Sequence, residues 1–177
     1  MLNNYYFSFG FFIPFFGIFT IRMCFTDSEG CKKIIAFIKG VEYLGDEEVI
    51  LQKNRNDCGV AALKMIFDHF EIPVSYEEIC EKVLEKGGST MLSLKRMANS
   101  KGLKVEGFIL SFEDLRKVKL PAITFVNGKH YVVISKITED RKIIVLDPSI
   151  GKLKYSFRQF QRIWKGYTLI FYHYENH

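Results

Sequence analysis

The sequence predicts an α+β fold in which N-terminal helices pack on an antiparallel sheet. Apolar residues recur at helical spacing, between polar helix caps, through most of residues 58–101. Short runs rich in β-branched and aromatic residues, separated by turn residues, follow over residues 105–174. Apolar residues make up 48% of the 177, enough for one domain with its own core. Helices first and strands later is the order typical of an α+β domain.

The helices are expected in the first part of the chain. A short helical pattern covers residues 31–39, and a longer one with a broad apolar face covers residues 58–70, with Asp57 as its N-cap. Ser75 and Glu78 form a capping box for a helix that runs to about residue 86. We interpret Gly87-Gly88 as the C-terminal cap of that helix rather than as a self-cleavage site. Thr90 caps the next helix, which is expected over residues 91–101.

The strands are expected where β-branched runs end at turn residues, namely at residues 105–110, 121–126, 130–137, 142–147, 153–157 and 167–174. Residues 111–114 read as a capped helical turn between the first two of them. Phe160, Ile163 and Trp164 are spaced as one face of a short helix before the last strand.

Cys58 stands at the start of the helix expected over residues 58–70. A thiol at a helix N-terminus meets the positive end of the helix dipole and unpaired backbone N–H groups, which favour the nucleophilic thiolate. Gln52, six residues upstream, is a neutral N–H donor that could be aimed at a developing oxyanion. A single cysteine is more often a small buried hydrophobe, the role that Cys80 fits on the inner face of its helix.

His130 and Asp147 follow in an order that suits the same chemistry. His130 opens one apolar strand after a turn, and Asp147 closes the next strand before Pro148. If the two strands are antiparallel neighbours, the residues lie side by side, and the carboxylate can hold the imidazole in the tautomer that takes a thiol proton. Alone, His130 could be a surface strand residue and Asp147 a turn starter. Together with Cys58, in this order, they predict a cysteine hydrolase.

These residues, taken together, resemble the pattern of a known family. Gln52, Asp57-Cys58-Gly59, His130 and Asp147-Pro148 are similar to the pattern of the C39 cysteine peptidases, the bacteriocin-processing endopeptidases with a papain-like fold. The resemblance runs from about residue 49 to about residue 172, and residues 157–169 look like that family's closing helix and strand. Residues 1–177 include no transporter or nucleotide-binding domain, which departs from the usual architecture of an ABC exporter with an N-terminal peptidase.

The resemblance implies an endopeptidase that cuts exported peptides after a double-glycine leader, with an ABC exporter as a partner. It implies that Cys58 attacks, His130 acts as general base and then general acid, and Asp147 orients His130. Gln52 and the Cys58 backbone N–H would stabilise the oxyanion. The specificity would come from a narrow slot that excludes any Cβ. No metal or nucleotide cofactor is required.

Several alternatives remain open at this stage. Tyr131 and Trp164 are candidates for the walls of the glycine slot, but core packing is the favoured interpretation of both. A non-catalytic leader-binding module is a second functional hypothesis, against which stands the presence of Cys58, His130 and Asp147. A third is another acyl-transfer enzyme with the same order of residues, such as a transglutaminase or an arylamine N-acetyltransferase. Gln52 and the small size favour a peptidase over that third hypothesis.

The first 21 residues carry no charged side chain, and residues 5–21 are almost wholly apolar. Such a stretch can just span a bilayer core of ~30 Å. Basic residues follow it, so the positive-inside rule places the C-terminal part in the cytoplasm. A signal peptide is one alternative, but the segment lacks a basic n-region and a small-residue cleavage site. A true start at Met23 is another alternative. We therefore expect a membrane anchor at residues 1–22, a connector at 23–48 and a peptidase domain at 49–174.

Charge and cysteine content narrow the partners and the compartment. The net charge of +5 comes without a compact Lys/Arg run, so nucleic acid is not an expected partner, whereas an anionic membrane surface or an acidic peptide would suit. Cys24 and Cys31 have no neighbouring histidine, which makes a zinc site improbable. Catalysis requires Cys58 in the reduced form, which the cytoplasm ensures.

Overall fold

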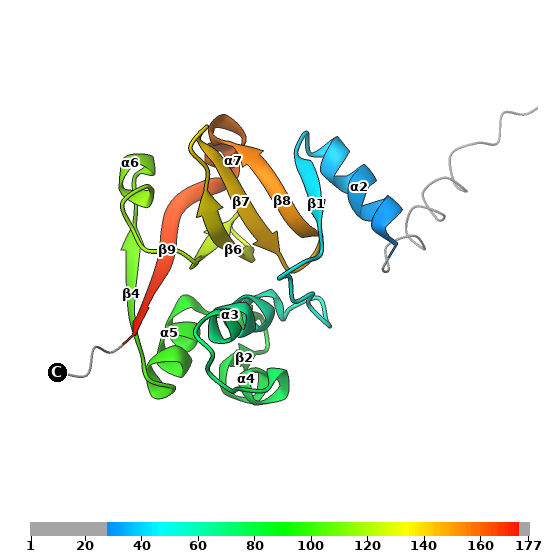
Figure 1. Cartoon of the computed structure of the whole chain (residues 1–177). Helices are drawn as coiled ribbons and strands as arrows, with labels where there is room; N and C mark the ends of the chain where they lie inside the picture. The colour runs from blue at the N-terminus through cyan, green and yellow to red at the C-terminus, as the bar shows by residue number, and fades with distance from the viewer. Residues whose placement is uncertain (1–27, 174–177) are drawn as a thin grey trace, which may run out of the picture.

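A computed structural model describes residues 28–173, which form a three-layer structure around one seven-stranded sheet (Figure 1). The spatial order is β1-β8-β7-β6-β5-β9-β4, and every neighbouring pair is antiparallel. The strands are β1 (Glu42–Gly45), β4 (Leu103–Ile109), β5 (Ala122–Val126), β6 (His130–Ile137), β7 (Lys142–Asp147), β8 (Gly151–Ser156) and β9 (Trp164–His173). A separate two-stranded hairpin joins β2 (Leu84–Glu85) to β3 (Gly88–Ser89).

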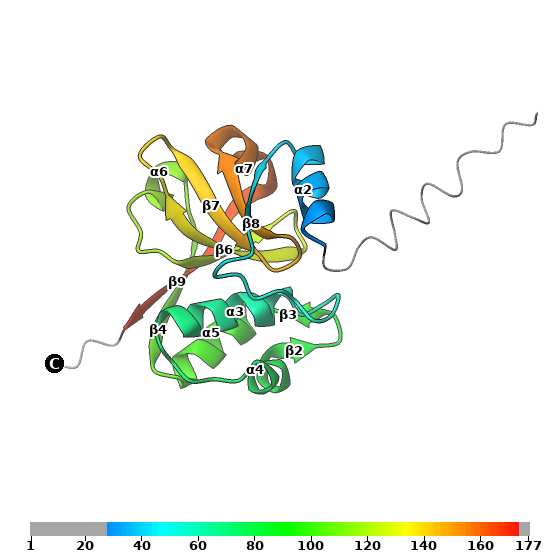
Figure 2. The same cartoon turned by 45° about the vertical axis from the view of Figure 1, so that its right-hand side comes forward.

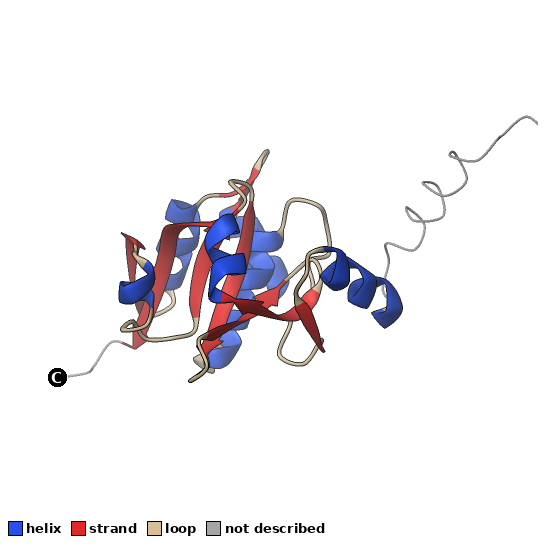
Figure 3. Cartoon of the chain, turned by 90° about the horizontal axis from the view of Figure 1, so that it is seen from above, coloured by secondary structure: helices blue, strands red, loops and turns tan. Residues whose placement is uncertain are grey.

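Helices cover both faces of the sheet (Figures 2 and 3). One face packs against α3 (Cys58–His69), α4 (Tyr76–Val83) and α5 (Met91–Ser100). The other face packs against α2 (Glu29–Ile38), α6 (Phe112–Leu115) and α7 (Phe157–Ile163). Because side chains alternate along a strand, β6 sends Tyr131 and Val133 to the first core and Val132 and Ile134 to the second.

Much of the predicted secondary structure is confirmed. β6 and β7 have the bounds predicted from the sequence, and α3 begins at Cys58. The Thr90 side chain accepts a hydrogen bond from the Ser93 backbone N–H at the start of α5, as a cap should. These elements have strong local signals, so their sequence alone defines them.

The helix expected to run to residue 86 ends earlier. α4 ends at Val83, and Leu84 is already extended. Leu84 pairs with Ser89 in the hairpin, so Gly87-Gly88 turns a hairpin rather than capping a helix. Gly88 has a φ of +111°, which glycine tolerates and a side chain would not. The cap interpretation was therefore wrong, because two glycines serve either kind of turn.

Trp164 belongs to a strand, not to the helical face predicted for it. α7 ends at Ile163, and Trp164 begins β9, opposite Val126 of β5. Its indole packs between Phe160 and Phe112, with ring centroids 5.7 and 5.6 Å away. Pairing across the sheet decides this position, and the helical spacing does not reveal it.

The stretch expected to be a connector contributes regular structure to the same unit. β1 was not predicted, because this four-residue edge strand, which pairs with β8, is too short to show periodicity. Ala36 of α2 and Val41 are buried in the second core. The apolar stretch at residues 5–21 lies outside the described residues. Between residues 28 and 173, no helix combines the length and the apolar character needed to cross a bilayer.

Candidate active site

Cys58 is the first residue of α3, the central helix on the first face of the sheet. The first turn of the helix is closed by a hydrogen bond from the Ala61 N–H to the Asp57 carbonyl, 3.0 Å long. Only 9% of Cys58 is exposed. The helix therefore presents a shielded thiol at its N-terminus, where the dipole and the free N–H groups favour a negative charge.

Asp57 does not act as the side-chain cap that the sequence predicted. Its carboxylate is fully buried and accepts hydrogen bonds from the backbone N–H and the side-chain amide of Asn54. It therefore pins the loop before Cys58 instead of the helix after it. The loop conformation decides which N–H groups the carboxylate can reach, and the sequence does not show that conformation.

His130 and Asp147 lie side by side at one end of the sheet, as expected from adjacent antiparallel strands. His130 opens β6, Asp147 closes β7, and His130 Nε2 lies 2.8 Å from Asp147 Oδ1. The same oxygen accepts hydrogen bonds from the Ser149 backbone N–H at 2.8 Å and from the Ser149 hydroxyl at 2.7 Å. Sequence reasoning missed Ser149, although an Asp followed two residues later by Ser is a common signal for such a turn.

Cys58, His130 and Asp147 shift one another's pKa values. Burial opposes ionisation of the Cys58 thiol, but hydrogen bonds from the His130 side chain and the Tyr131 backbone outweigh it and lower the pKa of the thiol. Burial also disfavours a charged His130, yet its hydrogen bonds with Asp147 and Cys58 raise its pKa to about 9.

Asp147 completes this chain of interactions. It is almost fully buried, which disfavours its charge, but its hydrogen bonds with His130 and Ser149 hold the pKa of its carboxyl below the ordinary value. Since Nε2 of His130 is engaged by Asp147, the other ring nitrogen, Nδ1, is the one left for the thiol. The arrangement favours a thiolate beside an imidazolium that is backed by a carboxylate.

Gln52 lies beside the Asp147 turn, because its backbone N–H donates to the Pro148 carbonyl at 2.9 Å. Its side-chain Nε2 donates to the Asn54 carbonyl at 2.7 Å, while its Oε1 is buried without a hydrogen-bond partner. A primary amide has two N–H groups, so one remains for a further acceptor. Gln52 thus lies next to the Asp147 turn, and one of its two amide N–H groups is used within its own loop.

A cleft of about 460 Å³ opens beside Cys58. Its lining includes residues of the β2–β3 hairpin, Met91 of α5, and Phe125, Lys129 and Tyr131 from β5, β6 and the turn between them. Tyr131 therefore is a wall residue of this cleft. Trp164 is not among its lining residues and is buried in the second core, so the structure assigns it to packing.

Gly59 allows the β2–β3 hairpin to approach α3 closely. A Cβ at Gly59 would lie 2.8 Å from the Ser89 Cβ and 2.9 Å from its Oγ, closer than side-chain atoms pack. The Ser89 hydroxyl is itself buried and makes no hydrogen bond. Glycine after Cys58 is thus required by the packing of Ser89 against α3.

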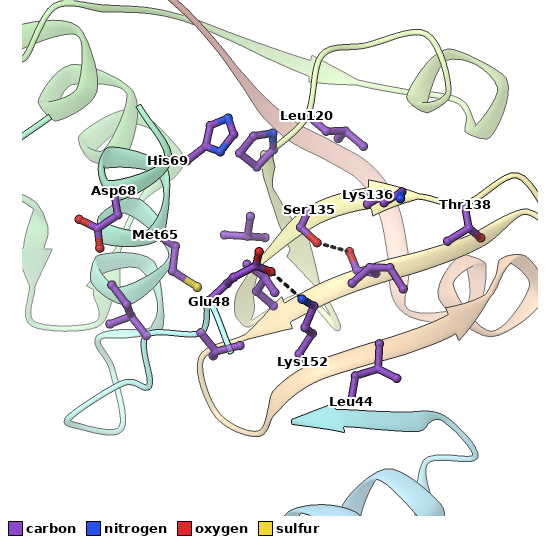
Figure 4. Close-up of a pocket in the computed structure, with 16 residues that line it drawn as sticks. Leu44, Glu48, Met65, Asp68, His69, Leu120, Ser135, Lys136, Thr138 and Lys152 are labelled. Carbon is purple, nitrogen blue, oxygen red and sulfur yellow. Dashed lines mark hydrogen bonds and ion pairs between the residues drawn. The ribbon is translucent and has the colours of Figure 1, made fainter. Parts of the chain in front are cut away.

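A larger cavity of about 890 Å³ lies towards the other end of α3 (Figure 4). Met65 and His69 of α3 face Ser135 of β6 across it, and Glu48 pairs with Lys152 at its side, as Figure 4 shows. Cys58, His130, Asp147 and Gln52 do not line it. Cys58 lines the smaller cleft instead, so we take that cleft, and not the larger cavity, as the candidate substrate site. In the described part of the chain, no three His, Cys, Asp or Glu side chains cluster so as to hold a metal ion.

Comparison with known proteins now decides the family. Residues 46–176 match the Peptidase C39 family. The chain belongs to this family. The match includes α3, which begins at Cys58, β6, which begins at His130, and β7, which ends at Asp147. It begins after α2 and β1, which stand outside it.

Individual relatives agree with the family assignment. An uncharacterized protein of Methanothermobacter thermautotrophicus is 31% identical over 128 residues, 72% of this chain and 89% of that protein. The probable functional amyloid protease FapD of Pseudomonas aeruginosa is 28% identical over 131 residues, 67% of this chain and 58% of FapD. A solved double glycine motif protease from an AMS/PCAT transporter, in complex with the leader peptide, has a TM-score of 0.68 and 28% identity, and the alignment covers 71% of this chain and 91% of that one. The fold is thus that of the papain-like C39 peptidase domains.

Proposed function

We propose that this C39 family member is a cysteine endopeptidase that removes double-glycine leader peptides from exported peptides. The observation that supports it most is the linked arrangement of Cys58, His130 and Asp147, with a lowered thiol pKa and a 2.8 Å contact between the last two. A structural role for these residues would not require a thiol of lowered pKa that lines a cleft.

In this proposal the Cys58 thiolate attacks the scissile carbonyl carbon, and the negative charge moves to the carbonyl oxygen. The backbone N–H of Cys58 and the free amide N–H of Gln52 donate to that oxyanion. The His130 imidazolium gives its proton to the leaving amine as the C–N bond breaks, which leaves a thioester on Cys58. His130, now neutral, takes a proton from water, the resulting hydroxide equivalent attacks the thioester, and the thiol is released.

Asp147 acts on His130 and not on the substrate. It accepts from Nε2 and so keeps Nδ1 directed to the thiol and to the leaving group. Ser149 holds Asp147 with two hydrogen bonds to the same oxygen, which fixes the carboxylate plane.

The proposed substrate class rests on the cleft and on the relative of known structure. That relative is a double glycine motif protease with a leader peptide bound, and its fold matches this chain over the same region. In this chain Tyr131 and the β2–β3 hairpin line the cleft beside Cys58. We propose that this cleft is narrow enough to reject residues with a Cβ before the cut.

The partner and the location belong to the same proposal. Because the similar protease comes from a transporter, we propose that an ABC exporter carries away the cleaved product. Residues 1–22 would anchor the chain in the membrane, and the peptidase domain at residues 49–174 would lie in the cytoplasm, where Cys58 stays reduced.

The test is cleavage of a synthetic leader peptide with two glycines before the cut, compared with the same peptide carrying two alanines. We expect one cut after the second glycine, a large loss with the alanines, no cleavage by Cys58→Ala, and full cleavage by the control Cys80→Ala. Gln52→Ala should lower the rate on the order of 10²–10³-fold, as loss of one oxyanion donor does. Binding of the leader without cleavage would favour a non-catalytic module, and transfer of the acyl group to an added amine faster than to water would favour another acyl-transfer enzyme.

A further inference from the structure

The outer face of α2 is unusually apolar for a helix on the surface of a domain. Ile34, Phe37 and Ile38 are 59%, 84% and 77% exposed. At about 100° per residue they form one stripe, and the buried Lys32 and Ala36 lie on the opposite side of the helix. We call Ile34, Phe37 and Ile38 the outer stripe of α2.

The outer stripe is held in place by contacts on the inner side of α2. Lys32 Nζ lies 2.6 Å from Asp46 Oδ2, beyond the end of β1, and only a tenth of the Lys32 side chain is exposed. Ala36 packs in the second core, and the Gln159 amide of α7 donates to the Gly40 carbonyl just after the helix. Figure 1 shows α2 beside β1, at the opposite side of the sheet from β4. The stripe therefore faces away from the domain because its neighbours fix it there.

Large apolar side chains that lie together on a surface mark an interaction site, so we expect the outer stripe to contact another molecule. The three side chains expose roughly 400 Å², about half of the ~800 Å² that each partner buries in a standard protein interface. A second copy of the chain therefore finds too small a surface here. A bilayer needs no matching shape and accepts a stripe of this size.

The sequence before α2 identifies the bilayer as the occupant. The first 21 residues carry no charge, and α2 begins at Glu29. The seven intervening residues reach at most about 25 Å, even fully extended. If residues 5–21 enter a membrane, α2 lies within that reach of its surface. Lys33 is exposed on the flank of the same helix, where it pairs with Glu29, and Lys39 follows the helix directly.

We propose that the outer stripe of α2 inserts into the membrane interface, so that α2 lies along the bilayer surface. This inference rests on the membrane anchor proposed above and is independent of catalysis. Because α2 and β1 are tied to the sheet through Lys32 and Asp46, the contact would hold the peptidase domain in one orientation rather than leave it on a loose tether. The active-site cleft would then stand at a fixed height above the surface.

The chain offers a simple fluorescence test, because its single tryptophan, Trp164, is buried. Full-length protein is reconstituted into vesicles of phosphatidylcholine and phosphatidylglycerol, with or without bromine on the acyl chains. Phe37→Trp places a reporter on the outer stripe, and Leu92→Trp places a matched reporter on α5, where Leu92 is 53% exposed. We expect brominated lipid to lower the added emission of Phe37→Trp about twofold and to leave Leu92→Trp and the parent unchanged, since interfacial helices bury side chains about 5–10 Å deep.

Flotation of the protein together with the vesicles is measured first, and cleavage of the double-glycine peptide is measured in parallel. Protein that floats without quenching of Phe37→Trp would overturn the proposal, as would a Phe37→Trp reporter shielded by a second copy. Protein that does not float would overturn the anchor and this inference together. If the double-glycine peptide is still cleaved in these experiments, the proposed peptidase function is unaffected by the failure of the membrane proposal. As a second variant, Ile38→Ser combined with Phe37→Ser should leave cleavage in detergent unchanged.

Discussion

Replacing Asp147 with asparagine should shift the pH range in which the site works. The three contacts of Asp147 all fall on Oδ1, from His130 Nε2 and from the N–H and hydroxyl of Ser149. All three groups can donate, so an asparagine should place its amide oxygen there and keep the hydrogen bonds. Asp147→Asn therefore removes the charge that faces His130 with little change in geometry.

The pKa of His130 gives the size of the expected effect. It is raised from the ordinary 6.5 to about 9, with Asp147 first among the groups that raise it and Cys58 second. A raised pKa keeps the imidazolium charged below pH 9, and the charge is lost as the pH rises through 9. In the limit of a full return to 6.5, the charged fraction at pH 8 falls from about 90% to about 3%, roughly a thirtyfold loss. At pH 5.5 that fraction changes little.

The assay is the pH dependence of kcat/KM for the double-glycine peptide between pH 5 and 10, with the His130 ring signal followed by NMR. The fall of kcat/KM at high pH, the upper limb of the profile, should have its midpoint near pH 9 in the parent. It should move down by more than one pH unit in Asp147→Asn. Asp140→Asn, an exposed change in the turn between β6 and β7, should leave the limb in place. An upper limb that stays at pH 9 without the Asp147 charge would refute the reasoning.

The same geometry gives three further predictions. Cys58 should react with iodoacetamide at neutral pH much faster than Cys80, since the pKa of the first thiol is lowered and burial raises that of the second; equal rates measured by mass spectrometry would contradict this. Gly59→Ala should lower the melting temperature and the cleavage rate because its Cβ meets Ser89, and Ser89→Gly in the same chain should restore both; no rescue would place the fault elsewhere. Asp57→Ala should cost about 1–3 kcal/mol of unfolding free energy in urea titrations, because it removes the buried carboxylate that accepts the hydrogen bonds of Asn54 and holds the loop, and a neutral result would show that the loop does not need it.

Local patterns in the sequence were sufficient for the elements that carry the chemistry. The apolar spacing after Cys58 defines a helix, and the β-branched runs that begin at His130 and end at Asp147 define two strands. Their order along the chain makes these strands antiparallel neighbours. This is why the sequence could foresee the contact between His130 and Asp147.

Other features depend on residues far apart in the sequence and could not be foreseen in the same way. The hairpin at Gly87-Gly88 forms against the nucleophile helix, and Trp164 becomes a strand residue by pairing with Val126. β1 exists because β8 offers it an edge. In each case, a local signal was ambiguous or absent, and a distant partner decided the conformation.

The sequence by itself therefore determined the fold class, the order of Cys58, His130 and Asp147, and the elements that hold them, because caps and hydrophobic periods act over a few residues. Only the tertiary structure decided which atoms of these residues meet, that Asp57 pins a loop instead of capping a helix, and that α2 turns Phe37 outward. Hydrogen bonds and burial depend on which segments pack together. That packing minimises the free energy of the whole chain and not of any one segment.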